Sequence, residues 1–111
     1  MKNNNSEFTN LSRAEVEALK ECFDFLRNGY IQIIDFFTEN IWVIKMKHQS
    51  NGNRLTIWIK KYTYTIYRNG ETVKTVFWRH DTGRYRLLVD SEMKVKVDRI
   101  DTGGVVKFIS G

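Results

Sequence analysis

The sequence predicts an α+β domain in which one N-terminal amphipathic helix packs on a curved, mostly antiparallel meander sheet of about eight short strands. Two observations point to this fold class. A single stretch with helical periodicity, residues 11–29, carries start and stop signals. The rest of the chain alternates between short apolar segments and turn signals, including two Asn-Gly dipeptides. A sheet of this size is expected to curl around the helix or to close partly into a barrel.

The 111 residues are predicted to form one domain, because a chain of this length buries enough surface for a single core. We expect residues 1–10 to be a flexible polar arm, with Phe8 against the domain, and residues 11–111 to be a single α+β domain. The start of the chain has no apolar run, so the sequence predicts no signal peptide, no membrane anchor and a cytoplasmic location.

The helix is predicted to span about residues 13 to 28. Ser12 followed by Glu15 forms a capping box, and Asn28-Gly29 supplies a left-handed residue at the other end. At 100° per residue the apolar side chains share one face. That face consists of Val16, Leu19, Cys22, Phe23 and Leu26, extended by Ala14, Ala18 and Phe25.

Residues 30–37 are predicted to form a strand that is central or buried on both faces, because its apolar run is broken only by Gln32 and Asp35. Residues 38–40 then turn the chain into a strand that begins at Ile41. This strand opens the first of two hairpins.

The first hairpin is expected to turn at Asn51-Gly52 in a two-residue type I′ turn. That turn would pair Lys45 with Trp58 and Met46 with Ile57. Because side chains alternate between faces, one face is apolar and is expected to join the core. The other face would carry Val43, Lys45, Lys47, Thr56, Trp58 and Lys60.

The second hairpin is expected to turn at Asn69-Gly70, pairing Arg68 with Glu71 and Ile66 with Val73. The apolar phase changes between the two hairpins, which predicts a bend or bulge near Lys60-Lys61. Further strands are expected at 84–89, around 93–98 and at 105–109, separated by turns at 81–83, 90–92 and 101–104.

The net charge of +5 is unevenly distributed. Residues 1–40 hold four Lys or Arg against seven Asp or Glu, whereas residues 41–111 hold fourteen against six. No acidic residue occurs from 40 to 70. A chain with this distribution is expected to attract an anionic partner to its sheet.

No motif in the sequence predicts catalysis, a metal or a cofactor. Asp-Thr-Gly occurs at 81–83 and 101–103, as in aspartic proteases, but the flanking residues differ and the triplet is also typical of tight turns. His80-Asp81 has no Ser or Cys placed to be activated, and Cys22 is interpreted as a small buried hydrophobe. We therefore expect a protein that is not an enzyme.

The basic, aromatic sheet face is the strongest functional signal, because single-stranded nucleic acids are bound by cations and stacking rings. We predict a non-catalytic binding protein that acts on single-stranded RNA or DNA, or on an RNA-bearing nucleoprotein nuclease as an inhibitor of the anti-CRISPR type would. Alternatives are a general single-stranded nucleic-acid-binding protein and a pure protein–protein inhibitor. The oligomeric state is left open. The predicted binding residues are Lys45, Lys47, Trp58, Lys60, Lys61, Trp78 and Arg79.

Overall fold

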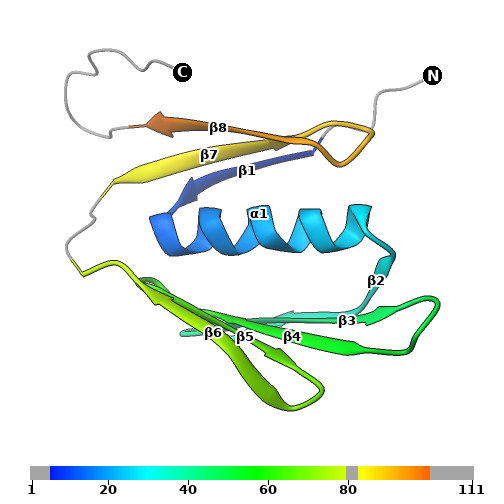
Figure 1. Cartoon of the computed structure of the whole chain (residues 1–111). Helices are drawn as coiled ribbons and strands as arrows, with labels where there is room; N and C mark the ends of the chain where they lie inside the picture. The colour runs from blue at the N-terminus through cyan, green and yellow to red at the C-terminus, as the bar shows by residue number, and fades with distance from the viewer. Residues whose placement is uncertain (1–5, 80–82, 101–111) are drawn as a thin grey trace.

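A computed structural model of the chain describes residues 6–79 and 83–100. In this part the chain forms one helix and eight strands (Figure 1). In chain order they are β1 (Ser6–Leu11), α1 (Arg13–Arg27), β2 (Tyr30–Phe37), β3 (Trp42–His48), β4 (Arg54–Ile59), β5 (Thr63–Arg68), β6 (Glu71–Phe77), β7 (Arg84–Val89) and β8 (Val95–Ile100).

The helix lies between two antiparallel sheets, so the fold has three layers (Figure 1). One sheet has three strands in the order β1-β7-β8, and the other has five in the order β2-β3-β4-β5-β6. The α+β class, the position of the helix and the approximate number of strands are confirmed. The single sheet curling into a barrel is wrong, because the strands divide into two sheets that cover opposite sides of α1.

The three-stranded sheet includes residues that the sequence placed in a flexible arm. Residues 6–11 form β1 and pair with β7, with Phe8 opposite Leu87. Phe8 is half-buried, and its ring lies 6.3 Å from that of Phe23 and 6.5 Å from that of Trp42. Leu11 is buried in the core. These apolar contacts explain why the polar segment is drawn into the sheet.

The ends of α1 follow the predicted capping chemistry. The Glu15 amide donates to Ser12 Oγ at 3.2 Å, and the Ser12 amide donates to Glu15 Oε1 at 2.7 Å. At the other end the Asn28 amide donates to the Phe25 carbonyl at 2.9 Å, and Gly29 follows with φ of +100°. Both boundary signals are therefore confirmed. No helix in the described residues has the length and apolarity needed to cross a membrane.

Substituting Gly29 with alanine is expected to cost about 2 kcal/mol or more of unfolding free energy, because an L residue is strained at positive φ. A Cβ at this position would also lie 2.6 Å from His48 Nε2. Gly52→Ala is the matched control, because Gly52 also has positive φ but no atom lies within 4 Å of its added Cβ. Urea denaturation should show the larger loss for Gly29→Ala, and equal losses would contradict the role of the His48 contact.

The core lies on both sides of the helix. The face of the five-stranded sheet toward α1, here called the inner face, contributes Met46, Leu55, Ile57, Ile59 and Ile66, each at most 2% exposed. From the other side Leu87 packs against the same helix and is fully buried. Burial on two sides explains the wide apolar surface of α1.

A polar cluster joins the helix to the inner face. The Tyr64 hydroxyl donates to Glu21 Oε2 at 2.6 Å, and Lys74 Nζ lies 2.5 Å from the same oxygen. Burial, followed by the hydrogen bond to Glu21, raises the pKa of Tyr64 above its usual range. The cluster fixes the rotation of the helix over the sheet, since it connects α1 to both β5 and β6.

The register of the first hairpin differs by two residues from the prediction. Lys45 pairs with Thr56 and Met46 with Leu55, because the loop contains four residues, 49–52, instead of two. The cause is His48, whose Nδ1 accepts from the Ser50 amide at 3.1 Å and organises the loop. A shift of two leaves each side chain on its predicted face.

The second hairpin turns at Asn69-Gly70 as predicted, with φ values of +50° and +87°, and Arg68 pairs with Glu71. The next pair, Tyr67 with Thr72, also has the predicted register, but from Ile66 on the prediction is wrong, because Ile66 pairs with Lys74 and not with Val73. The extra residue is a β-bulge in β6. It turns Lys74 to the inner face, where its ammonium contacts Glu21.

The position of β2 also differs from the prediction. The strand has the predicted bounds, but it is an edge strand, and all of its residues except Tyr30 are exposed. The apolar run predicted burial, and nothing within residues 6–79 and 83–100 pairs with its free side.

Candidate nucleic-acid interface

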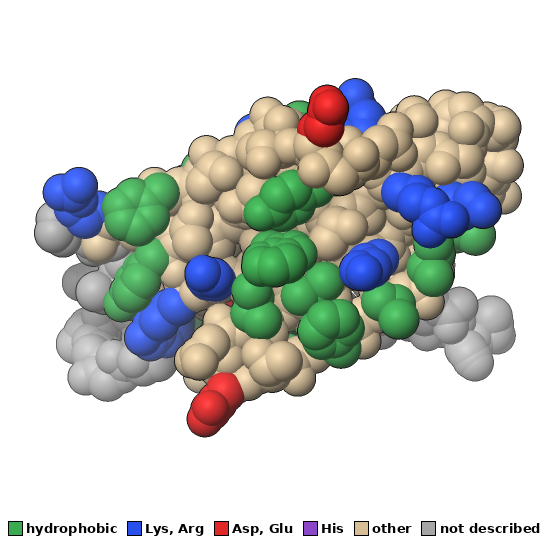
Figure 2. All heavy atoms as spheres, turned by 90° about the horizontal axis from the view of Figure 1, so that it is seen from below, with side chains coloured by type: hydrophobic (Ala, Val, Ile, Leu, Met, Phe, Trp, Pro, Cys, Tyr) green, Lys and Arg blue, Asp and Glu red, His purple; other side chains and the backbone are tan. Residues whose placement is uncertain are grey.

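The outer face of the five-stranded sheet is the side turned away from α1. The register places Lys45, Lys47 and Trp58 on this face, at positions that alternate with buried core residues. Seen from below, hydrophobic side chains gather over its middle with Lys and Arg side chains beside them (Figure 2). Three of the seven predicted binding residues therefore share one surface.

A shallow groove of about 390 Å³ crosses this face. The Trp58 side chain is 42% exposed, although it is a large aromatic residue in a central strand. Its ring stands edge-on to that of Tyr67, with centroids 5.9 Å apart and planes at 63°. The groove is lined by Phe36, Val43, Lys45, Thr56, Trp58, Tyr67 and Gly70.

The positive charge of the outer face is locally concentrated. Lys47 pairs directly with Arg54 across β3 and β4, and like charges in this position destabilise a sheet. Among the described residues no ion pair joins Lys45, Lys47 or Arg54 to an acid. The two acidic residues of the five strands, Asp35 and Glu71, lie at inner-face register positions. Acidic side chains do appear near the margins of this view (Figure 2), so the cations without acidic partners are those around the Lys47–Arg54 pair.

Arg54 is not among the binding residues that the sequence predicts. A two-residue turn at Asn51-Gly52 places Arg54 opposite Gln49, whereas the four-residue loop places it opposite Lys47. Its even position does indicate the correct face, because Thr56 and Trp58 follow at intervals of two.

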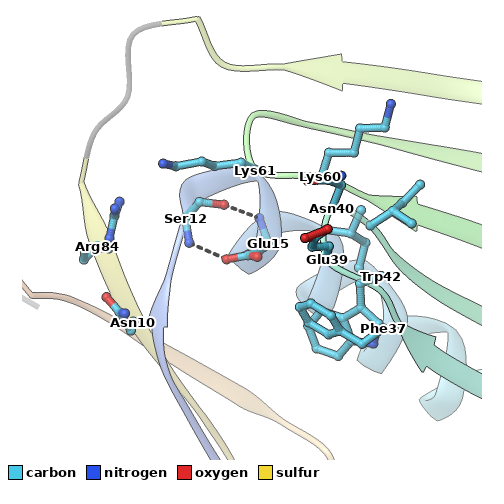
Figure 3. A pocket seen from close by; sticks show the side chains of 12 residues that line it. Asn10, Ser12, Glu15, Phe37, Glu39, Asn40, Trp42, Lys60, Lys61 and Arg84 are labelled. Carbon is cyan, nitrogen blue, oxygen red and sulfur yellow. Dashed lines mark hydrogen bonds between the residues drawn. The ribbon is translucent and has the colours of Figure 1, made fainter.

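Lys60 and Lys61 lie at the turn between β4 and β5, at one end of the sheet. They line a separate pocket of about 330 Å³ beside the start of α1, together with Arg84 (Figure 3). The pocket also contains Glu39 and Glu15, and the side chain of Glu15 is hydrogen-bonded to the Ser12 amide. Its mixture of charges gives no preference for an anion.

Trp78 and Arg79 are not brought to the outer-face groove. Trp78 is half-buried on the inner side, where its ring stacks on Tyr64 with centroids 6.0 Å apart. The guanidinium of Arg13 lies 5.5 Å from the Trp78 ring centre. Arg79 follows in an exposed bend. Trp78 therefore serves packing, and its position on the inner side separates it from Trp58.

The remaining reactive side chains have structural positions. Burial raises the pKa of the Cys22 thiol to about 12, so at neutral pH it is a protonated, buried group. His48 Nε2 lies 3.2 Å from the Asn28 carbonyl and Nδ1 accepts from Ser50, so both ring nitrogens are used locally. Within residues 6–79 and 83–100 no group of three His, Cys, Asp or Glu side chains is placed to bind a metal ion.

Several predicted features lie outside the described residues: His80, Asp81-Thr82, the second Asp-Thr-Gly at 101–103 and the strand at 105–109.

The comparisons with known proteins provide no family for this chain. No protein-family model matches it, and neither the curated proteins nor the solved structures contain a match. Its function is therefore inferred from its own surface chemistry.

Proposed function

We propose that the protein is a non-catalytic binding protein that holds a single-stranded nucleic acid against the outer face of its five-stranded sheet. The observation that carries this proposal is the Lys47–Arg54 pair, two cations that are opposed on neighbouring strands and have no acidic partner, on the same face as the exposed ring of Trp58. A pair of like charges on neighbouring strands costs stability unless anions lie beside them. A phosphate group is such an anion.

Each part of the face has a separate role in this mode of binding. Lys45, Lys47 and Arg54 would contact successive phosphates, and a base would stack on Trp58, with Tyr67 supporting the ring from its edge. Stacking requires a base that is free of a duplex, so a single strand is preferred over double-stranded DNA. Lys60, Lys61 and Arg79 would contribute only at the margins, and Trp78 is left out because it packs inside.

The bound strand can be free or can belong to a nucleoprotein. In the second case the protein would act as an inhibitor of an RNA-bearing nuclease, of the anti-CRISPR type. A pull-down treated with nuclease distinguishes the two settings from a pure protein inhibitor. Loss of the partner after treatment supports binding through the nucleic acid, whereas recovery of one stoichiometric protein argues for a protein–protein inhibitor.

The direct test is fluorescence anisotropy of labelled single-stranded RNA, single-stranded DNA and duplex DNA at low and physiological salt. With three cations on phosphates, the plot of log K against log salt concentration is expected to have a slope of about −2. Single strands should bind more tightly than the duplex. Absence of binding to every probe at low salt would overturn the proposal, and equal binding of the duplex would exclude stacking on Trp58.

A further inference from the structure

Strand β2, at one edge of its sheet, differs from the other strands of that sheet in the side chains that it exposes. Five large apolar side chains of this strand are exposed by 46% to 65%: Ile31, Ile33, Ile34, Phe36 and Phe37. Edge strands are usually protected by lysine or another charge. Strand β2 has no Lys or Arg and a single charged residue, Asp35, whereas β3, β4, β5 and β6 each carry at least one Lys or Arg. The edge thus combines unpaired backbone with apolar side chains.

A β-bulge gives β2 an approximate two-fold symmetry. The register shifts between Gln32 and Ile34, leaving Ile33 as the extra residue. As a result Gln32 and Asp35, three positions apart, both lie opposite inner-face residues of β3. Tyr30 and Phe37 also lie on the inner face, whereas Ile31 and Phe36 both lie on the outer face. Read from either end, β2 therefore presents residue types in the same order on each face: aromatic then polar on the inner face, and large apolar on the outer face.

This symmetry suits an antiparallel partner of identical sequence. In a contact with two-fold symmetry, a pair between one residue of the first copy and another residue of the second copy occurs twice, once on each side of the axis. A two-fold axis between Ile33 and Ile34 would set Tyr30 against Phe37, Ile31 against Phe36 and Gln32 against Asp35, always on a shared face. The Gln32 amide could donate to the carboxylate of Asp35, whose Oδ1 accepts from Trp42 Nε1 at 2.9 Å. No like charges would oppose each other.

The exposed apolar side chains of β2 set the largest side-chain area that a contact through this strand can bury. With full areas of about 200 Å² for each large side chain, the exposed fractions amount to about 500 Å² of apolar surface for one copy. Complete burial of these side chains in both copies would remove about 1,000 Å² from solvent, which is the lower limit for a specific interface, before the backbone is counted.

We propose that two copies of this chain associate through β2, pairing the strands antiparallel in the register that sets Gln32 opposite Asp35 of the second copy. The two five-stranded sheets then become one continuous sheet, and their outer faces adjoin. This inference does not depend on nucleic-acid binding.

The first test is the mass in solution, measured by light scattering and sedimentation over a range of micromolar concentrations. The wild type is expected at twice the chain mass of 13.2 kDa. Ile33→Lys should return it to the single-chain mass, because the lysine would face Ile34 across the axis. Val73→Lys is the matched control, since Val73 is 49% exposed on β6 at the opposite edge. A monomeric wild type, or dissociation by Val73→Lys with Ile33→Lys still dimeric, would overturn the proposal.

The second test addresses the register through disulfide formation between singly substituted chains. Mixing the Gln32→Cys and Asp35→Cys proteins under oxidising conditions should give a cross-linked dimer, because directly opposed residues lie within disulfide reach. Each variant alone should remain uncross-linked, since residue 32 is offset from its own copy. Cys22 is buried and does not compete. Cross-linking within a single variant, or none in the mixture, would contradict this register.

Discussion

Reversing the charge of Lys45, Lys47 and Arg54 together to glutamate is expected to weaken binding of a single-stranded oligonucleotide by at least about 100-fold. The variant removes the phosphate contacts and places repelling carboxylates on the outer face. All three side chains are on solvent-exposed strand positions, so the melting temperature should change by only a few degrees. Anisotropy titration and thermal denaturation of the same preparation measure both quantities.

The matched control reverses Lys20, Lys94 and Lys96, which are exposed on α1, before β8 and on β8. Both triple variants carry the same net charge. The control should bind with an affinity close to that of the wild type if the cations act locally. An equal loss in both variants would show that attraction depends on overall charge, and the outer face would lose its assignment.

The single substitution Arg54→Glu is expected to change stability and affinity in opposite directions, which separates a role in binding from a role in folding. It replaces a like-charge pair by an opposite pair with Lys47, so the unfolding free energy is expected to rise by a few tenths to about 1 kcal/mol. The affinity for the oligonucleotide should fall in the same protein. A joint decrease of stability and affinity would indicate that Arg54 has a structural role instead.

Ile57→Ala is expected to lower the unfolding free energy by about 3 to 4 kcal/mol and the melting temperature by more than about 10 °C. Ile57 is fully buried in the central strand β4, between Ile44 and Ile66 on the inner face beneath the helix. The truncated side chain leaves a cavity that two opposed layers cannot easily close. Urea denaturation gives the free energy directly.

Val73→Ala is the control for this substitution, because it also shortens a branched aliphatic side chain but at a half-exposed edge position. Its cost should stay below about 1 kcal/mol. Similar losses at both positions would mean that the inner face is not the principal core.

Local patterns in the sequence were sufficient for the helix and for the division of side chains between faces. The capping box and Gly29 fix the helix ends through bonds within a few residues, so no distant contact is needed. The faces of β3 and β4 were predicted correctly although the turn was not, because a shift of two residues preserves alternation. Lys45, Lys47 and Trp58 therefore appear together as expected.

The remaining features depend on contacts between distant residues. The four-residue loop follows from a His48 ring that also contacts Asn28, and the bulge in β6 presents Lys74 to Glu21 of the helix. The hairpin sequences alone do not indicate that Asn28 and Glu21 will be neighbours of these residues. The edge position of β2 also could not be predicted. An apolar run is typical of a buried strand, and it does not show whether other strands of the same chain will cover it. Trp78 was misplaced for the same reason, since its stacking partner Tyr64 lies in another strand.

The pairing of β1 with β7 also implies an order of assembly. Strands β2 to β6 lie in the sheet in their order along the chain, so the five-stranded sheet closes only short loops. By contrast, Phe8 pairs with Leu87, so all the residues between these two must be synthesised before that contact exists. The helix is thus covered on one side early and on the other side late. During translation, the apolar side of α1 that later meets Leu87 remains open to solvent or to a chaperone until β7 emerges.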